Sequence, residues 1–229
     1  MIMLQDIRTS PPVACPYLEG RTFVQEYFFA HQLDENEFDY YLTRGWRRFG
    51  TYFFRPSCPG CRACVPIRIN GAELTLSSSQ KKVVKKNGET EVRLRPLEYS
   101  EKLFDIYQSH SRRFDEEERD SNDFRETYFQ RAVPAFQTEY YRGGEMVAFG
   151  FVDVGHSGLS SVYYSYDTNY SDLSLGTYSV IRETQLTVEA GLEWYYLGYY
   201  IAECSRMAYK GRFFPRQLYN WEKERWEDG

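Results

Sequence analysis

The sequence of 229 residues predicts an α+β protein in two parts, residues 1–91 and 92–229. Two observations lead to this prediction. Three of the five cysteines lie within seven residues, as CPGCRAC at 58–64, inside a basic and aromatic segment. From residue 92 the pattern changes to a strand, two helices, three antiparallel strands, a helix and a last strand. A small cysteine-cluster domain is therefore expected before a larger mixed domain.

Length and composition limit the class of protein. The chain is long enough to bury a sizeable core. Its longest apolar stretches, near 146–152 and 194–200, have the length of strands, so no membrane span is expected. The first residues lack the basic and apolar regions of a secretory signal. We expect a soluble protein of the reducing cytoplasm.

The charges are unevenly distributed along the chain. The net charge is −5, yet residues 41–96 contain twelve basic and only three acidic side chains. Aromatic residues make up 18% of the chain, with 21 tyrosines, and such rings suit surfaces that stack on bases or contact partner chains. A cationic face on an acidic body predicts a polyanionic partner such as RNA.

The N-terminal part reads as an arm followed by short elements. Prolines at 11, 12 and 16 exclude a helix and predict an irregular arm over residues 1–19. Asp34 and Glu37 form a capping box for a short helix that ends at Gly45. Residues 46–54 and 65–70 are strand-like, and the cysteine loop joins them. The serines at 77–79 cap a helix over 80–86 that carries Lys81, Lys82, Lys85 and Lys86.

The cysteine spacing indicates a metal site. Cys58, Cys61 and Cys64 come from one loop, and Cys15 in the extended arm supplies a fourth thiol for zinc or an iron–sulfur cluster. Cys204 lies in a different segment and is expected to stay outside this group. Ordinary reduced thiols are the main alternative, and a disulfide fits a reducing compartment less well.

The second part has the element order of an acyltransferase fold. We expect a strand over 92–97, helices over 101–111 and 122–132, an exposed acidic loop over 115–120, strands over 138–142, 145–154 and 160–167, a helix over 175–190 and a strand over 194–200. This is the order in the GNAT superfamily. The stretch SLGT at 174–177 replaces that superfamily's glycine-rich acetyl-CoA loop, so neither coenzyme A nor a nucleotide cofactor is expected.

Six stretches in order resemble the bacterial branch of the aminoacyl-tRNA–protein transferases. They are CPYL at 15–18, GWRRFG at 45–50, FRP at 54–56 with CPGCRACVPIRI at 58–69, SQK at 79–81, SLGTY at 174–178, and YLGY at 196–199 through MAYK at 207–210. The resemblance implies a GNAT-like domain and transfer of an amino acid from its tRNA to an N-terminal Asp or Glu of a protein, which marks that protein for the N-degron pathway. The bacterial cysteine pattern favours leucine over arginine.

Candidate site residues follow from this chemistry. We expect Asp167, with Tyr164 and Tyr166, to handle the proton of the acceptor amine. Arg47 or Arg48 is expected to bind the acidic side chain, with Trp46 and Tyr199 in the same substrate site, and alternation would turn one of the two arginines outward to solvent or RNA. Backbone amides at Leu175 and Gly176 suit a phosphate or an oxyanion. The four lysines and Arg62 are expected to bind tRNA.

Two other classes of function remain open at this point. A non-catalytic metal-containing module that binds RNA would use the same cysteines and basic face, and a CoA-dependent acetyltransferase would share the second domain's fold. Serine precedes Arg112 and Arg113 where relatives commonly carry Arg-His, so no catalytic histidine is expected. His110 and His156 are interpreted as a helix residue and a turn residue.

Overall fold

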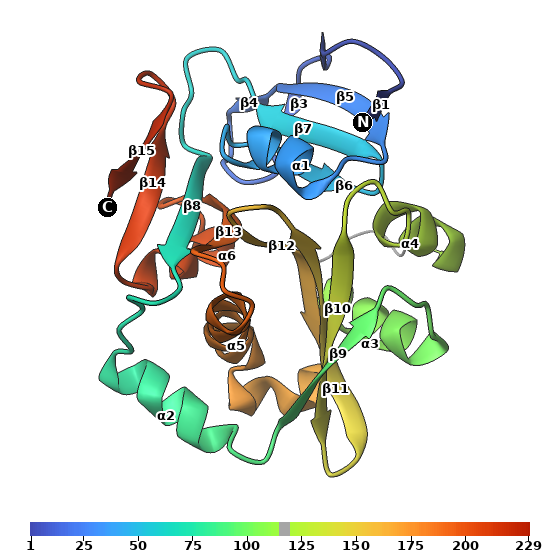
Figure 1. Cartoon of the computed structure of the whole chain (residues 1–229), viewed down its shortest axis with the longest axis vertical. Helices are drawn as coiled ribbons and strands as arrows, with labels where there is room; N and C mark the ends of the chain where they lie inside the picture. Colours follow the sequence, from blue (N-terminus) through green and yellow to red (C-terminus); the bar gives the residue numbers. More distant parts are fainter. Residues whose placement is uncertain (115–119) are drawn as a thin grey trace.

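The computed structural model describes residues 1–114 and 120–229 and confirms an α+β architecture, with a small sheet stacked on one end of a large one (Figure 1). The predicted acidic loop falls largely on residues 115–119, outside the described residues. Among the described helices none is long and apolar enough to cross a membrane. Asp120 caps the helix that follows, since its carboxylate accepts from the backbone N–H groups of Asn122 and Asp123.

The N-terminal part is built on a short antiparallel sheet. Its strands are β1 (Ile2–Met3), β2 (Arg8–Thr9), β5 (Gln25–His31), β6 (Arg47–Phe49) and β7 (Tyr52–Pro56), with a separate pair β3 (Val13–Ala14) and β4 (Thr22–Phe23). Helix α1 (Glu35–Leu42) begins at the predicted capping box and buries Phe38 against Phe28 and Phe53. The predicted strand over 46–54 is two strands, because Gly50 turns the chain with φ +54°. The irregular arm predicted over residues 1–19 is wrong in part, since β1 and β2 pair with β5.

The large sheet has eight strands. Their order is β15 (Arg225–Asp228), β14 (Arg216–Asn220), β8 (Val65–Asn70), β13 (Trp194–Tyr200), β12 (Gly158–Tyr166), β11 (Glu145–Val154), β10 (Ala135–Arg142) and β9 (Glu91–Pro96). Strand β8 comes from the N-terminal part and pairs with β13 and β14. The sheet therefore includes strands from both sides of the predicted division at residue 91, and the division itself stays a prediction.

Helices cover both faces of this sheet (Figure 1). Helices α3 (Glu101–Ser111) and α4 (Ser121–Tyr128) pack on Phe149 and Phe151, whereas α5 (Leu175–Glu189) packs on the opposite face with α2 (Ser78–Lys86) beside it. Short helical turns are α6 (Ser205–Ala208), η1 (Arg112–Phe114), η2 (Thr168–Leu173) and η3 (Tyr209–Arg212).

The sheet splits between its two central strands. Strands β12 and β13 are parallel and pair only from Gly158 to Ser160 on one side and from Trp194 to Tyr196 on the other. Beyond that point β12 stays paired with β11, and β13 stays paired with β8. The two strands consequently diverge, and side chains from other elements fill the gap.

Candidate functional site

Arg47 of β6 reaches into the gap between β12 and β13. Its Nη1 donates a hydrogen bond to the Ser160 hydroxyl at 2.6 Å, and its Nη2 donates to the carbonyl oxygen of Ser161. Ser160 is the last residue of β12 that pairs with β13. The guanidinium therefore lies where the sheet opens, and it ties the small sheet to the large one.

Lys210 enters the same gap from η3. Its Nζ donates to the carbonyl oxygen of Tyr199 at 3.1 Å. A Cβ placed on Gly198, whose φ is +86°, would lie 3.5 Å from the Lys210 Nζ and 3.7 Å from the Arg47 Nη2. Both cations thus border one stretch of β13 backbone, and a side chain at residue 198 would be strained and crowd them.

Neither cation is paired with a carboxylate of the described residues, although Asp153, the ion-pair partner of Arg48, is near enough to Arg47 for their charges to interact. Within residues 1–114 and 120–229, neither Arg47 nor Lys210 forms an ion pair with a carboxylate. Burial, together with the nearby Arg47 charge, lowers the pKa of Lys210 to about 7. Burial also lowers the pKa of Arg47. Both side chains remain partly accessible to solvent, so this gap is suited to bind an anion.

Arg48 differs from its neighbour. Its guanidinium pairs with Asp153 in an almost completely buried ion pair and also donates to the Gly50 carbonyl oxygen at 2.8 Å. The expectation that one of the two arginines points outward is wrong, because Arg48 is only 4% exposed and Arg47 is half-buried and hydrogen-bonded to Ser160 in the gap. The charge of Arg48 is balanced inside the core, so Arg48 is not available to a ligand in the gap.

Trp46 and Tyr199 lie behind the gap as buried supports. Trp46 packs on Phe28, and Arg55 stacks over its ring. The Tyr199 hydroxyl donates to the Gly45 carbonyl oxygen at 2.8 Å. These contacts fix the start of β6, and with it the position of Arg47. Direct contact of either ring with substrate stays a prediction.

The predicted catalytic group lies elsewhere on β12. Asp167 accepts from the backbone N–H of Asn169 at 3.0 Å and caps η2, as a turn-forming Asp does. The Tyr166 hydroxyl accepts from Arg113, and the Tyr164 hydroxyl is buried. Six residues of extended strand put Asp167 roughly 20 Å from Ser161. The structure does not bring this group to Arg47, and its catalytic role stays a prediction.

The start of α5 and the lysines of α2 are neighbours. Lys86 donates to the Asp172 carbonyl oxygen at 2.6 Å, just before α5 begins at Leu175. No side chain caps that helix, and the space around Gly176 is open. Lys81, Lys82 and Lys85 are exposed. Arg62 instead lies in the cysteine loop at the opposite end of the molecule (Figure 1), where it donates to the Cys58 carbonyl oxygen at 3.0 Å. The predicted tRNA contacts therefore form two separate surfaces.

Two of the four predicted thiols pack together, with one addition. Cys15 and Cys64 lie in one cluster with Cys204, and the exclusion of Cys204 from a metal site stays a prediction. Burial, together with the neighbouring thiols of Cys58, Cys15 and Cys61, raises the pKa of Cys64 to about 12. The Cys58 sulfur accepts a hydrogen bond from the backbone N–H of Val24 and donates one to the carbonyl oxygen of the same residue.

These thiols have the right chemistry for zinc or iron but are not arranged as ligands. In the part of the chain that the structure describes, no three His, Cys, Asp or Glu side chains form a metal-binding set. The metal site stays a prediction, and no step of the reaction is derived from it.

Glu183 is a buried acid that the sequence reasoning missed. Its carboxylate lies between α5 and the sheet and accepts hydrogen bonds from Thr138 at 3.1 Å, Tyr140 at 3.2 Å and Tyr195. Burial raises its pKa to about 7. The available signal was an acidic residue on the otherwise apolar face of this helix. Lys210 was also missed, because only the tertiary fold brings it to Arg47.

Comparisons with known proteins give a consistent result. The family models described as Arginine-tRNA-protein transferase match residues 13–82 with the N-terminal model and 99–220 with the C-terminal model. An aspartate/glutamate leucyltransferase of Campylobacter jejuni is 32% identical over 222 residues, which cover 93% of this chain and 92% of that protein. One of Afipia carboxidovorans is 33% identical over 238 residues. Among solved structures, L-PGS from Bacillus licheniformis has a TM-score of 0.51 at 14% identity, over 76% of this chain and 52% of that one, which is a likeness of fold alone.

Proposed function

Because the chain belongs to the arginine-tRNA–protein transferase family, we propose that it transfers leucine from leucyl-tRNA to the α-amine of a protein that begins with Asp or Glu. The chain is an aminoacyltransferase, and the relatives that favour leucine are matched over nearly their whole length. Arginine is the second candidate for the transferred amino acid. The new N-terminal leucine would mark the acceptor for the N-degron pathway.

The observation that carries the acceptor specificity is the pair of cations in the gap. Arg47 and Lys210 line one stretch of backbone, and neither forms an ion pair with a described carboxylate. The side chain of an N-terminal Asp or Glu has a compact carboxylate close to the reacting amine. A guanidinium offers this group a fork of donors, and a lysine adds a second charge. We assign the acceptor's side chain to this gap.

The reaction needs orientation more than strong acids or bases. The neutral α-amine attacks the ester carbonyl carbon, an amide bond forms, the bond to the ribose oxygen breaks, and that oxygen leaves with a proton. An α-amine has a pKa near 8 and is partly neutral at neutral pH. By holding the carboxylate next to it, Arg47 and Lys210 fix the amine relative to the ester, which supplies a large part of the rate.

The architecture proposed with this function is a GNAT-like acyltransferase domain joined to a small cysteine-rich part. Two observations support it. From β9 to β13, two helices and three antiparallel strands precede α5, and the parallel strands β12 and β13 diverge. The donor is aminoacyl-tRNA in place of coenzyme A.

A matrix of transfer assays tests the proposal. Leucyl- and arginyl-tRNA are each combined, under anaerobic conditions, with peptides that begin with Asp, Glu, Asn or Ala. We expect label from leucyl-tRNA to be far greater on the Asp and Glu peptides than on the Asn and Ala peptides, since the cations lose their partner when the carboxylate is missing. Equal labelling of the Ala peptide would refute the acceptor assignment, and labelling only from arginyl-tRNA would replace leucine. Acetylation that depends on acetyl-CoA would overturn the donor.

A further inference from the structure

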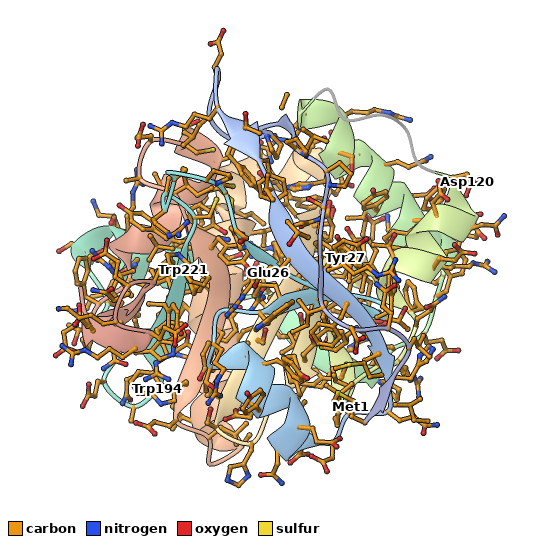
Figure 2. The ribbon with its side chains drawn as sticks, turned by 90° about the horizontal axis from the view of Figure 1, so that it is seen from above. Met1, Glu26, Tyr27, Asp120, Trp194 and Trp221 are labelled. Carbon is orange, nitrogen blue, oxygen red and sulfur yellow. The ribbon has the colours of Figure 1, made fainter. Side chains whose placement is uncertain are left out.

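A cavity of about 480 Å³ lies between the end of α1 and the hairpin of β14 and β15. Four arginines and two aromatic rings line it together with Thr43 and one acidic residue, Glu224; the arginines and rings are Arg44, Arg55, Arg68, Arg225, Tyr219 and Trp226. The Trp226 indole donates to the Thr43 carbonyl oxygen at 2.9 Å and so joins the hairpin to the N-terminal part. In Figure 2, Trp194 and Trp221 mark this side of the molecule, and Asp120 lies on the other side. The volume of the cavity is in the range of sites that bind small molecules.

Two of the four arginines are in no ion pair with a described residue, although Glu224 also lines the cavity. Arg55 pairs with Glu26, and Arg225 pairs with Glu227. Arg44 and Arg68 form no ion pair with any carboxylate that the structure describes. Arg44 donates to the Tyr40 carbonyl oxygen and stacks on the Tyr40 ring at 3.8 Å, which leaves donors free.

Arg68 is the more buried of these two cations. It donates to Gln217 at 2.7 and 3.0 Å and to the Tyr196 hydroxyl at 3.2 Å. Its guanidinium lies over the rings of Trp194 at 3.7 Å and Trp226 at 4.5 Å. A cavity with arginine forks and ring faces matches a phosphate linked to a flat base, which is the chemistry of a single-stranded nucleotide.

The cavity lies beside the proposed transfer site. Arg68 on β8 is the register partner of Tyr196 on β13, and Tyr196 is the partner of Ser160 on β12. Ser160 is the residue that Arg47 contacts. Residues at one level of adjacent strands point to the same face, and two strand spacings amount to roughly 10 Å. An RNA end in the cavity therefore lies within reach of the gap.

We propose that this cavity binds a nucleotide of the unpaired 3′ end of the tRNA, with Arg44 and Arg68 toward its phosphates and an aromatic ring against its base. The inference rests on the proposed function, because only that function makes tRNA the partner. The exposed lysines of α2 have a different chemistry, since point charges on a helix suit the regular backbone of a duplex. The cavity would thus hold the end that carries the ester.

The test measures RNA binding without any transfer, so its failure is distinct from failure of the proposed function. Fluorescence anisotropy gives the Kd of uncharged tRNA, intact or lacking its unpaired 3′ nucleotides, for the wild type and for the double variant Arg44→Gln, Arg68→Gln. Arg44 is exposed and Arg68 is half-buried, and an unchanged melting temperature verifies the fold. Arg93→Gln, on edge strand β9 at the other side of the sheet, is the matched control.

We expect truncation of the RNA to weaken wild-type binding about tenfold, the order given by one stacked base. The double variant should bind intact tRNA about as weakly as the wild type binds truncated tRNA, and truncation should not weaken its binding further. The Arg93→Gln control should show the same tenfold loss on truncation as the wild type. An equal truncation effect in the double variant and the wild type would overturn the proposal. Unchanged tRNA binding with a raised KM for acidic peptides would assign the cavity to the acceptor instead.

Discussion

Replacing Lys210 by methionine removes one of the two cations that line the gap between β12 and β13. A charged hydrogen bond of this kind contributes about 2 kcal/mol, so kcat/KM for an Asp-initiated peptide should fall roughly thirtyfold. The residual activity with an Ala-initiated peptide should not change, because that acceptor has no carboxylate to bind. The ratio of the two rates, and not the absolute rate, is the diagnostic quantity.

The pH dependence gives a second measure of the same contact. The pKa of Lys210 is lowered to about 7, so in the free enzyme its charge is present below that pH and is lost above it. The KM for acidic peptides, divided by that for the Ala peptide whose α-amine titrates over the same range, should therefore rise as the pH increases through 7 toward 9. Arginine keeps its charge over this range, so this ratio should be low and flat for Lys210→Arg, and high and flat for Lys210→Met.

The assay is initial-rate leucyl transfer to Asp, Glu and Ala peptides between pH 6 and 9. Lys102→Met, an exposed lysine on α3, is the matched control. The Lys210→Met fold should be at least as stable as the wild type at neutral pH, since an unpaired buried charge has been removed. A proportional loss of activity with all three peptides would refute the acceptor role, and so would a wild-type KM ratio that does not vary with pH.

Three other changes have defined outcomes. Arg48→Met leaves a buried carboxylate without its partner and should cost about 4 kcal/mol, seen as a melting temperature lower by ~10 °C; a shift below 2 °C would contradict the buried pair. The pKa of Glu183 is raised to about 7, so its protonated carboxyl stabilises the fold at low pH, and about 3 kcal/mol of stability is lost as the pH rises through 7. In Glu183→Gln, the free energy of unfolding measured in urea should not show this loss. Lys82→Ala with Lys85→Ala should reduce the salt dependence of tRNA binding, and an unaltered slope would remove α2 from the interface.

Metal content tests the cysteine prediction. Anaerobically purified protein should contain zinc or iron, and Cys58→Ser should lose it and melt at a lower temperature. Absence of metal from the wild type, together with unchanged melting of the variant, would contradict the prediction. Protein purified in air is not a suitable sample, because iron–sulfur clusters are lost to oxidation.

Much of the fold follows from short-range patterns in the sequence. The capping box of Asp34 with Glu37 starts α1 as expected, and the expected serine cap of α2 is Ser77, which forms a capping box with Gln80. The pair Gly143 and Gly144 closes the β10–β11 hairpin with positive φ angles of 57° and 85°. These features are set by a few neighbouring residues, so the sequence is sufficient to locate them.

Sheet membership was harder to predict. The hairpin of β14 and β15 was not expected, and β8 joins a sheet whose next strand, β13, lies more than a hundred residues further along the chain. Pairing between distant segments depends on the whole fold and leaves little trace in a local window.

The candidate site shows the same division between local and long-range information. The sequence alone identified a basic, aromatic segment with two adjacent arginines and a family whose substrates would need them. It did not separate Arg47 from Arg48, because their difference is the carboxylate of Asp153, a partner 105 residues away from Arg48. Lys210 lies beside Arg47 only because β12 and β13 diverge, and its proposed contact with the acceptor depends on that position. Charge is a property of one residue, but whether that charge is buried, balanced or free depends on which distant groups the fold places beside it.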